Sequence, residues 1–252
     1  MNISLVGFGR MGNILKDLAG EQGIEVVSTI DPVSKQATHT ELNKESVSGA
    51  DVCIDYTAPD NVLGNIEKYC SLGKNVVVGT TGWYDSVELV KKQVEEAKIG
   101  LIYASNFSVG VNAFYRIVES AAKTMNALQE YDVLGLEMHH NLKKDSPSGT
   151  AKSLEKILLN GIDRKSKVVE EKLGRKIDES ELHFASVRGG NIPGTHSIMF
   201  DSEADTIELK HTARSRKGFA LGSLKAAEFV NGKKGFFTID DLMDKIIGKG
   251  GN

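Results

Sequence analysis

Cysteine and proline are scarce in this chain of 252 residues, which contains 2 cysteines and 4 prolines. Two cysteines are too few for a disulfide-rich scaffold or for a zinc site built from cysteine. Neither sign of charge dominates, because 31 Lys and Arg residues face 34 Asp and Glu residues. The resulting net charge of −3 lacks the basic surface that non-specific nucleic-acid binding requires, so we expect no nucleic-acid partner.

Long apolar runs are also missing. No stretch approaches the roughly 20 apolar residues that cross a bilayer, and the N-terminal residues lack the basic region and apolar core of a signal peptide. We therefore expect no membrane contact and a cytoplasmic location. Glycine is plentiful by contrast, with 26 residues. Many of these glycines end apolar runs, where the backbone turns tightly or approaches a ligand.

Short β-branched runs alternate with helical patterns through the first hundred residues. The expected strands are Ile3–Val6, Glu25–Ile30, Val52–Tyr56, Asn75–Val78 and Ile99–Ala104. Their alternation with helices predicts βαβ crossovers and a mainly parallel sheet. A long helix follows over 109–125, the stretch 181–213 is typical of strands, and helical patterns return after residue 218. We interpret the charged segment 163–176 as a solvated loop.

Gly7-Phe8-Gly9-Arg10-Met11-Gly12 fits G-x-G-x-x-G, directly after the first expected strand and at the start of a helical run. In that context the glycines permit a tight turn, close approach of a pyrophosphate and packing of helix on strand. Asp31 ends the second strand, where a carboxylate can bind ribose hydroxyls and would repel a 2′-phosphate. NADH is therefore favoured, with NADPH as the alternative, since Arg10 or Lys35 could reach a 2′-phosphate.

We therefore predict an α/β protein of two domains. A Rossmann-like parallel-sheet domain is expected over 1–107, completed by the C-terminal helices within 218–252, and an α+β domain with a mixed sheet over 108–217. Two further strand ends, Gly79-Thr80-Thr81-Gly82 and Ala104-Ser105-Asn106-Phe107, lie at the edge of the sheet where open α/β folds bind ligands. Ordinary loop chemistry is the alternative for both.

The densest group of reactive side chains lies within 137–150. His139, His140, Lys143 and the helix start Ser148-Gly149-Thr150 suit an anionic substrate and a proton-transfer step. The helix start offers hydroxyl and N–H groups to a carboxylate. The structural alternative is an ordinary helix cap beside surface histidines, and the density of donors argues against it.

Other features remain open at this point. The glycine-rich segment 187–196 forms either a pocket wall or a connection between strands, and strand-end residues such as Arg216 are usually solvated. Cys53 and Cys70 have no histidine nearby in sequence, so we interpret them as small buried residues.

With these residues in view, the chain resembles the 4-hydroxy-tetrahydrodipicolinate reductase family (formerly dihydrodipicolinate reductase) almost from end to end. The motifs include Gly79-Thr80-Thr81-Gly82, Asn106–Asn112 and the highly specific segment 137–151. The resemblance implies that NADH or NADPH reduces 4-hydroxy-tetrahydrodipicolinate to tetrahydrodipicolinate with loss of water, in the diaminopimelate route to lysine. It also implies a homotetramer assembled through 108–217, the substrate-binding domain.

The same resemblance implies residue roles. His139 and Lys143 correspond to the proton-handling pair, His140, Gly149 and Thr150 correspond to substrate contacts, and Ser148 joins them as part of the helix start. The expected nucleotide contacts are Gly7, Phe8, Gly9, Arg10, Met11, Gly12, Asp31, Gly79, Thr80, Thr81, Ala104, Ser105, Asn106 and Phe107. No metal is expected.

Two departures and two rival functions accompany this prediction. Many members have a glycine loop one residue longer and an Arg after the acidic residue, whereas Pro32 follows Asp31 here. One rival is a two-domain dehydrogenase that acts on an aldehyde or hydroxy acid. The other is a non-catalytic nucleotide sensor, which has no need of an acid and a dicarboxylate clamp.

Overall fold

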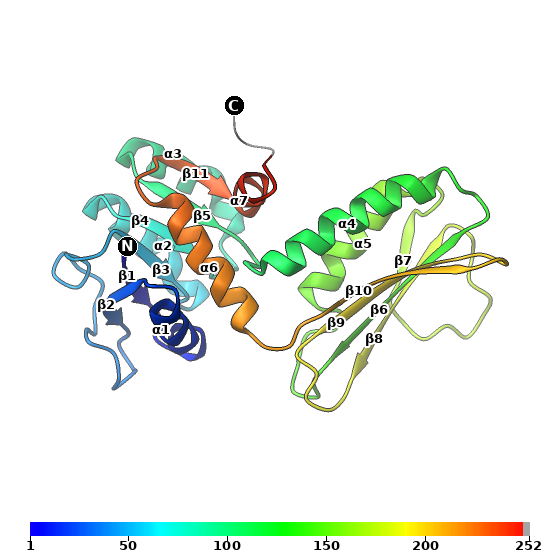
Figure 1. Ribbon diagram of the computed structural model, residues 1–252, viewed down its shortest axis with the longest axis horizontal. Helices are drawn as coiled ribbons and strands as arrows, with labels where there is room; N and C mark the ends of the chain where they lie inside the picture. Colours follow the sequence, from blue (N-terminus) through cyan, green and yellow to red (C-terminus); the bar gives the residue numbers. More distant parts are fainter. Residues whose placement is uncertain (249–252) are drawn as a thin grey trace. The chain divides into compact units, whose positions relative to one another are not determined.

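The computed structural model describes residues 1–248 (Figure 1). The chain divides into two compact units: unit 1 contains Met1–Val109 and the chain from Arg216 onward, and unit 2 contains Gly110–Ser215. No helix among the described residues is both long and apolar enough to cross a membrane.

Unit 1 is built on a six-stranded sheet in which every pairing is parallel. Its strands are β1 (Asn2–Val6), β2 (Glu25–Ile30), β3 (Val52–Asp55), β4 (Asn75–Val78), β5 (Gly100–Tyr103) and β11 (Gly235–Thr238), in the spatial order β11-β5-β4-β3-β1-β2. The unbroken valine run of β4 is fully buried, as expected of a strand covered on both faces. The parallel sheet confirms the predicted class, while β11 was not foreseen.

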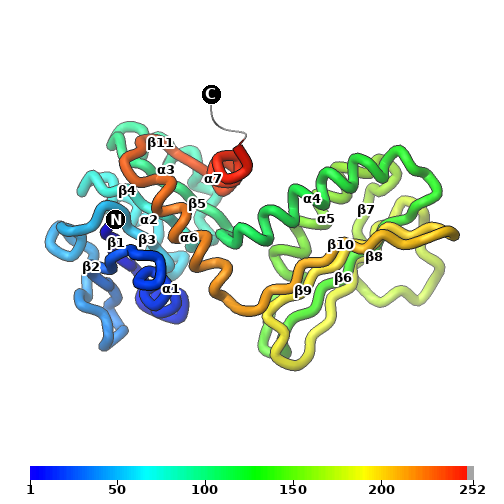
Figure 2. The backbone as a smooth tube through the Cα atoms, viewed as in Figure 1, coloured from blue at the N-terminus to red at the C-terminus, as the bar shows by residue number. Residues whose placement is uncertain are grey.

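Helices flank this sheet. They are α1 (Arg10–Glu21), α2 (Pro59–Leu72), the short 3₁₀ helix η1 (Tyr84–Ser86), α3 (Val87–Ala97), α6 (Lys217–Val230) and α7 (Ile239–Ile246). Although α6 follows α1 by some 200 residues, the two pack side by side, as Figure 2 shows. Ala220, Leu224 and Ala227 of α6 share one core with Ile3 and Leu5 of β1. The C-terminal segment therefore completes the first unit.

The strand order creates a topological switch point. The chain moves outward from β1 to β2 and then returns to the opposite side of β1 to form β3. Open α/β sheets bind ligands outside the carboxyl ends of the strands at such a point. Gly7 follows β1 and Tyr56 follows β3, so both lie at this edge.

Unit 2 is a mixed five-stranded sheet with two helices on one face (Figure 1). Its elements are α4 (Val109–Asn126), β6 (Asp132–His139), α5 (Gly149–Gly161), β7 (Lys167–Val169), β8 (Glu181–Arg188), β9 (Thr195–Asp201) and β10 (Thr206–Thr212), with strand order β10-β9-β6-β8-β7. The helices bury Val118 and Leu154 against Phe184 and Phe200 of the sheet. The mixed sheet confirms the prediction.

Strand β7 corrects one local expectation, because it lies inside the segment predicted to be a solvated loop. It has three residues and pairs in parallel with β8. Its half-buried Val168 packs against the core of unit 2. Three residues are too few for a hydrophobic period to be visible, so only the pairing with β8 reveals this strand.

Candidate active site

Each glycine of the predicted nucleotide loop meets a steric requirement. Gly7 has φ +85°, and a Cβ on it would strike the backbone of Tyr56. A Cβ on Gly12 would lie 2.7 Å from the carbonyl oxygen of Gly7, so α1 packs this closely only because a side chain is absent. Gly9 has open space where its Cβ would be. Turn, close packing and open approach are the three roles of the glycines in a dinucleotide-binding loop.

The N-terminus of α1 is prepared for an anion. Gly9 is its N-cap, no side chain caps the helix, and no acidic residue occurs in the first turn. Uncapped N–H groups and the positive end of the helix dipole favour a phosphate. Arg10 is exposed beside them, whereas the side chain of Phe8 is buried in the core, so only the backbone of Phe8 can serve a ligand.

Asp31 lies at the end of β2, but its carboxylate already binds the backbone. Oδ2 accepts from the N–H of Phe8, and Oδ1 accepts from the N–H groups of Val33 and Ser34, each at 2.8 Å. Burial alone would raise the pKa of Asp31, but the three hydrogen bonds outweigh it, so the pKa lies below its ordinary value. Roughly one of four acceptor positions remains for a ribose hydroxyl.

A pocket of about 200 Å³ collects many of the predicted nucleotide residues. It is lined by Met11, Tyr56, Gly79, Ala104, Ser105, Asn106, Phe107, Arg216 and Phe219. Sequence reasoning missed Tyr56 and Phe219 and left Arg216 ambiguous. Their only signal was position: Tyr56 ends an expected strand, Arg216 follows one, and Phe219 begins an expected helix.

Tyr56 explains why residue 79 is a glycine. A Cβ on Gly79 would penetrate the Tyr56 ring. The Tyr56 hydroxyl shares a 2.7 Å hydrogen bond with Ser223 of α6. Burial raises the pKa of Tyr56 to about 12, against the lowering effect of Ser223, so the phenol stays neutral. The ring forms a fixed apolar wall of the pocket.

The two threonines after β4 lie in different surroundings. Thr80 is buried, its hydroxyl donates to the carbonyl of Thr57 at 2.9 Å, and its own carbonyl accepts from the Trp83 indole at 2.9 Å. Thr81 is exposed and does not line the pocket. Thr80 therefore supports the loop through these hydrogen bonds. No hydrogen bond among the described residues joins Thr81 to another predicted site residue.

In unit 2 the predicted polar segment begins at the end of β6. Glu137 and His139 lie on the face of β6 that carries the buried Val133, and both are buried, with exposed fractions of 0% and 7%. His140 follows the strand; its N–H donates to the carbonyl of Ile192, and its buried Nδ1 has no partner among the described residues. These histidines are therefore not the surface residues of the structural alternative.

Glu137 is the centre of this cluster, and the sequence prediction did not include it. Its Oε1 accepts from the Ser148 N–H at 3.0 Å, the Ser186 hydroxyl at 2.8 Å and the Arg188 guanidinium at 2.7 Å. Burial opposes ionisation, but the nearby His196 ring and the hydrogen bonds from Ser148, Arg188 and Ser186 hold the pKa of Glu137 far below its ordinary value. The carboxylate is therefore ionised.

His139 lies beside this charge. Burial lowers its pKa most, and the positive charges of Lys143 and Arg188 and the proximity of His196 add to the effect; Glu137 opposes them. The net result is a pKa of about 4. The imidazole of His139 is therefore neutral at pH 7 in this structure.

Lys143 lies in the turn after β6, with its side chain 21% exposed. Its ammonium donates to both carboxylate oxygens of Asp145, at 2.8 and 2.9 Å. The hydrogen bond from Lys143 is the main reason that the pKa of Asp145 lies below its ordinary value. The Lys143 ammonium is thus positioned by the carboxylate of Asp145, whose own side chain is mostly exposed.

The predicted helix start is real. Ser148 is the N-cap of α5 and accepts from the Ala151 N–H at 3.1 Å, so its hydroxyl has the capping role of the structural alternative. The same hydroxyl lies 3.1 Å from Nε2 of His196. Gly149 has open space where a side chain would be. Thr150 is hydrogen-bonded to the half-buried Tyr115 of α4.

One group of described residues has the donor set of a metal site. Atoms of Glu137, His139 and His196 lie within 4.8 Å of one another. The carboxylate is already paired with Arg188, and His196 with Ser148, and a guanidinium this close opposes a second cation. We therefore interpret the group as a hydrogen-bonding cluster, and the absence of a metal stays a prediction.

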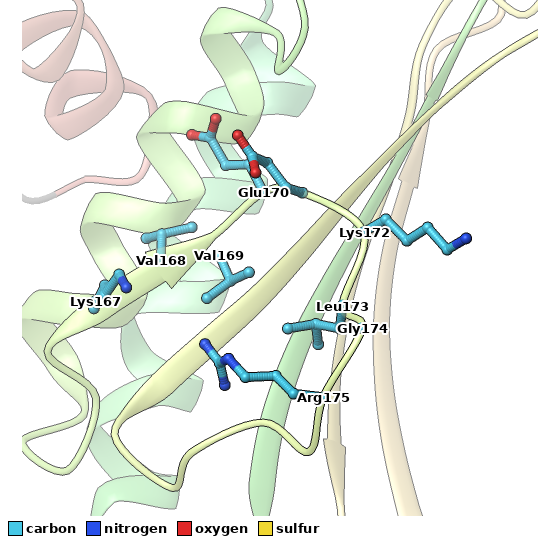
Figure 3. Close-up of a pocket in the computed structure, with 9 residues that line it drawn as sticks. Lys167, Val168, Val169, Glu170, Lys172, Leu173, Gly174 and Arg175 are labelled. Carbon is cyan, nitrogen blue, oxygen red and sulfur yellow. The ribbon is translucent and has the colours of Figure 1, made fainter.

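A second pocket, of about 430 Å³, lies along β7 and the loop after it (Figure 3). It is lined by 167–175, and none of the predicted site residues contributes to it. Arg175 and Lys167 pair with the buried carboxylate of Glu181, at 2.7 and 3.5 Å. These ion pairs attach the loop to the start of β8. We therefore interpret the charged residues of this pocket as structural.

The fold and the two groups of residues define a class of protein. A parallel sheet with a glycine loop at its switch point is a dinucleotide-binding domain. The second unit places a histidine, a lysine and a helix start close together, which is the equipment for proton transfer to an anion. This combination is that of a two-domain, nucleotide-dependent oxidoreductase.

Comparison with known proteins identifies the family. The family model described as dihydrodipicolinate reductase, N-terminus, matches residues 1–107, and its C-terminus model matches residues 110–243. The chain belongs to the dihydrodipicolinate reductase family, which confirms the resemblance seen in its motifs, and it is an oxidoreductase.

Relatives and a solved structure agree. The 4-hydroxy-tetrahydrodipicolinate reductase of Christiangramia forsetii is 37% identical over 98% of this chain and 99% of that protein. The same-named protein of Archaeoglobus fulgidus is 37% identical over 94% of this chain and 96% of its own length. A dipicolinate-bound dihydrodipicolinate reductase from Paenisporosarcina sp. TG-14 shares the fold, with a TM-score of 0.76 at 22% identity over 94% of this chain and 97% of that one.

Proposed function

We propose that this chain catalyses the reduction of 4-hydroxy-tetrahydrodipicolinate to tetrahydrodipicolinate in the diaminopimelate route to lysine. The balanced reaction consumes one NAD(P)H and one proton and releases NAD(P)⁺ and one water. The observation that carries the proposal is the cluster of His139, Lys143 and the α5 helix start, found in a member of this reductase family. The full-length relatives that bear the reductase name support it.

The nucleotide residues fit a dinucleotide. A reduced nicotinamide nucleotide supplies the hydride when bound. Gly9 and the uncapped N-terminus of α1 would hold its pyrophosphate, and the pocket between Tyr56 and the 104–107 segment has the apolar wall that a nicotinamide ring requires. Both features are built into unit 1 by its own packing.

The substrate residues fit a dicarboxylate. Ser148, Gly149 and Thr150 present a helix N-terminus with open space at Gly149. A carboxylate is favoured there by the N–H groups and the helix dipole. Lys143 and the ring of His140 supply further donors for the second carboxylate or the ring nitrogen.

Lys143 is the better proton donor of the catalytic pair. The ring nitrogen of the substrate gains negative charge as the hydride arrives, so a proton must be delivered there. His139 is neutral at pH 7, because its pKa is lowered to about 4. An imidazolium is therefore scarce, whereas Lys143 carries a positive charge beside Asp145. We assign proton delivery to Lys143 and orientation of the transferred proton to His139.

The nucleotide preference is a finer proposal. The Asp31 carboxylate opposes a 2′-phosphate, which favours NADH. Because three backbone N–H groups already occupy Asp31, its bond to a ribose is weak, and NADPH remains a usable cofactor. The ratio of kcat/KM for the two nucleotides measures this preference directly.

A homotetramer is the proposed assembly. The sheet face of unit 2 opposite α4 and α5 carries Leu134 and Val187, which are 36% and 48% exposed, next to the half-buried Leu136, Met138 and Met199. An apolar sheet face of this kind is stabilised by packing against a second copy. Light scattering gives the oligomeric state, and Leu134→Lys should dissociate the assembly. A cytoplasmic location stays a prediction, in keeping with two free cysteines.

The decisive experiment measures NADH and NADPH oxidation with freshly generated cyclic imine, using wild type, Lys143→Ala and His139→Ala. We expect turnover with the imine, and a loss of roughly 10²- to 10⁴-fold in kcat for the variants, with nucleotide binding unchanged because both residues lie in unit 2.

Other results would reject the proposal. Wild-type kinetics in both variants contradicts the assignment of the pair. Turnover with an aldehyde or hydroxy acid but not with the imine favours another dehydrogenase. Nucleotide binding without any oxidation favours a sensor.

A further inference from the structure

The two oxygens of the buried Glu137 carboxylate have different surroundings. Oε1 accepts three hydrogen bonds, as described above. Oε2 makes no hydrogen bond to any residue in the described part of the chain, yet it lies 3.2 Å from Nδ1 of His139 and 3.5 Å from Nε2 of His196. Nδ1 of His139 is equally buried and has no other partner among these residues. The two atoms are therefore buried neighbours, 3.2 Å apart, and neither has another hydrogen-bond partner among the described residues.

We propose that Glu137 is a positioning residue, whose Oε2 accepts the Nδ1 proton of His139 and thereby fixes both the ring orientation and its tautomer. An ionised carboxylate can only accept hydrogen bonds, and a neutral imidazole carries one proton. The proton of His139 therefore resides on Nδ1, and the lone pair resides on Nε2.

The carboxylate is well suited to this task because it cannot rotate. The Ser148 N–H, the Ser186 hydroxyl and the Arg188 guanidinium reach Oε1 from β8 and from the start of α5. Oε2 is thereby held close to the rings of His139 and His196. The positive charge of Arg188, 2.7 Å from Oε1, also keeps the buried carboxylate ionised.

The opposite side of the ring is fixed as well. Gly194 has φ +152°, and a Cβ on it would lie 2.9 Å from Nε2 of His139. The ring of His196 meets the His139 ring edge-to-face, with centroids 5.2 Å apart. Thus the sheet gives His139 one acceptor at Nδ1 and keeps side chains away from Nε2.

This arrangement deepens the proposed function and rests on it for its chemical meaning. With a lone pair on Nε2, His139 accepts a hydrogen bond in the resting enzyme and does not itself donate a proton there. By accepting one hydrogen of the Lys143 ammonium or of a water, it can turn another hydrogen of that donor toward the substrate. The wrong tautomer would place a hydrogen on Nε2 and oppose that alignment.

Glu137→Gln tests the tautomer, because the three donors at Oε1 dictate how the amide must sit. Its oxygen will take the Oε1 position, so its NH₂ group will face Nδ1 of His139. Nδ1 must then accept, and the proton moves to Nε2. Two-dimensional ¹⁵N NMR of histidine-labelled protein should show Nδ1–H in the wild type and Nε2–H in the variant.

The kinetic readout is a fall of about 100-fold in kcat for Glu137→Gln, with unchanged nucleotide affinity. Glu137→Asp keeps an acceptor-only group, so it should retain the Nδ1–H tautomer and recover part of kcat. Glu155→Gln is the matched control, because it also removes a buried carboxylate from unit 2. It should change neither the tautomer nor kcat.

The possible failures are distinguishable. An Nε2–H tautomer in the wild type, or the same tautomer in wild type and Glu137→Gln, overturns the positioning role whatever the activity. Equal loss of kcat in Glu137→Asp and Glu137→Gln, with the tautomer of His139 unchanged in both, also overturns it and leaves a structural role. If the wild type does not turn over the imine, the proposed function fails while the tautomer measurement remains valid.

Discussion

Asp55 in unit 1 and Glu137 in unit 2 are both fully buried carboxylates near the carboxyl end of a strand, yet their surroundings differ. Both oxygens of Asp55 are satisfied: Oδ1 accepts from the N–H and hydroxyl of Thr57, and Oδ2 accepts from the Asn65 amide and the Tyr69 hydroxyl, at 2.7–3.0 Å. Glu137 concentrates its donors on one oxygen and leaves the other facing histidines. A carboxylate with hydrogen bonds at both oxygens stabilises the fold. A carboxylate with one oxygen left over can also accept a hydrogen bond from a catalytic group.

The donors also differ in charge. The four donors of Asp55 are neutral; burial raises its pKa and the hydrogen bonds only partly oppose this. For Glu137, donors that include the Arg188 guanidinium overcome the same burial effect, and its pKa is lowered. A buried carboxylate therefore stays reliably ionised where a cation is built in beside it.

The largest expected effect comes from Asp55→Ala. The variant removes the acceptor of the Tyr69 and Thr57 hydroxyls and leaves the Asn65 amide with the Thr57 hydroxyl alone. We expect the free energy of unfolding to fall by at least about 3 kcal/mol, measured by urea denaturation. The tautomer of His139 should not change, because Asp55 belongs to the other unit. A stability equal to that of the wild type would contradict a structural role for this network.

Glu155 offers a pH-dependent contrast to Glu137. Burial, then repulsion from Glu170, raises its pKa to about 7 from 4.5, against a lowering by Lys152. The folded state thus binds one more proton than the unfolded state between those pH values. The stabilising contribution is complete below pH 4.5 and is lost as the pH rises through 7.

Glu155→Gln should remove this dependence. At pH 8 the variant should be more stable than the wild type by up to about 3 kcal/mol, and near pH 4.5 the two should be similar. Urea titrations at several pH values measure the difference. A constant difference between the two proteins across that range would show that Glu155 ionises normally.

The smallest effects come from removing single donors. Tyr69→Phe takes one hydrogen bond from Asp55 and should cost about 1–3 kcal/mol, because a buried acceptor loses one of its donors. Ser186→Ala takes one donor from Glu137, where Arg188 and the Ser148 N–H remain, and should cost about 1 kcal/mol. The His139 tautomer should persist in Ser186→Ala, since Arg188 and the Ser148 N–H still hold the carboxylate and Oε2 stays next to Nδ1 of His139. A tautomer change there would mean that Ser186 alone orients the carboxylate.

Sequence patterns predicted the larger elements well. The parallel strands of unit 1, the long helix α4 and the start of α5 at Gly149 carry strong periodicity or cap chemistry. The predictions missed β7 and β11, which lie outside the strand–helix alternation that revealed the equally short strands β3, β4 and β5. The pairing partners of β7 and β11, Glu181–Arg188 and Gly100–Tyr103, lie elsewhere in the chain.

The same limit explains the site residues that were missed. Arg188 and His196 reach Glu137 from neighbouring strands, 51 and 59 positions along the chain. Sequence spacing contains no information about which strands become neighbours. Tyr56 and Phe219 likewise join one pocket only because α6 packs beside the sheet of unit 1.

The amino-acid order alone determined which chemistry is present: a glycine loop that only glycine's backbone freedom and small size permit, and a histidine, lysine and helix cap within one short segment. Those features are local, so a linear pattern contains them. Tertiary packing alone decided their electrostatic state. The burial of Glu137, the cation beside it and the neutral form of His139 depend on strands brought together from distant segments, and the strength of a charge interaction depends on the medium that those strands create.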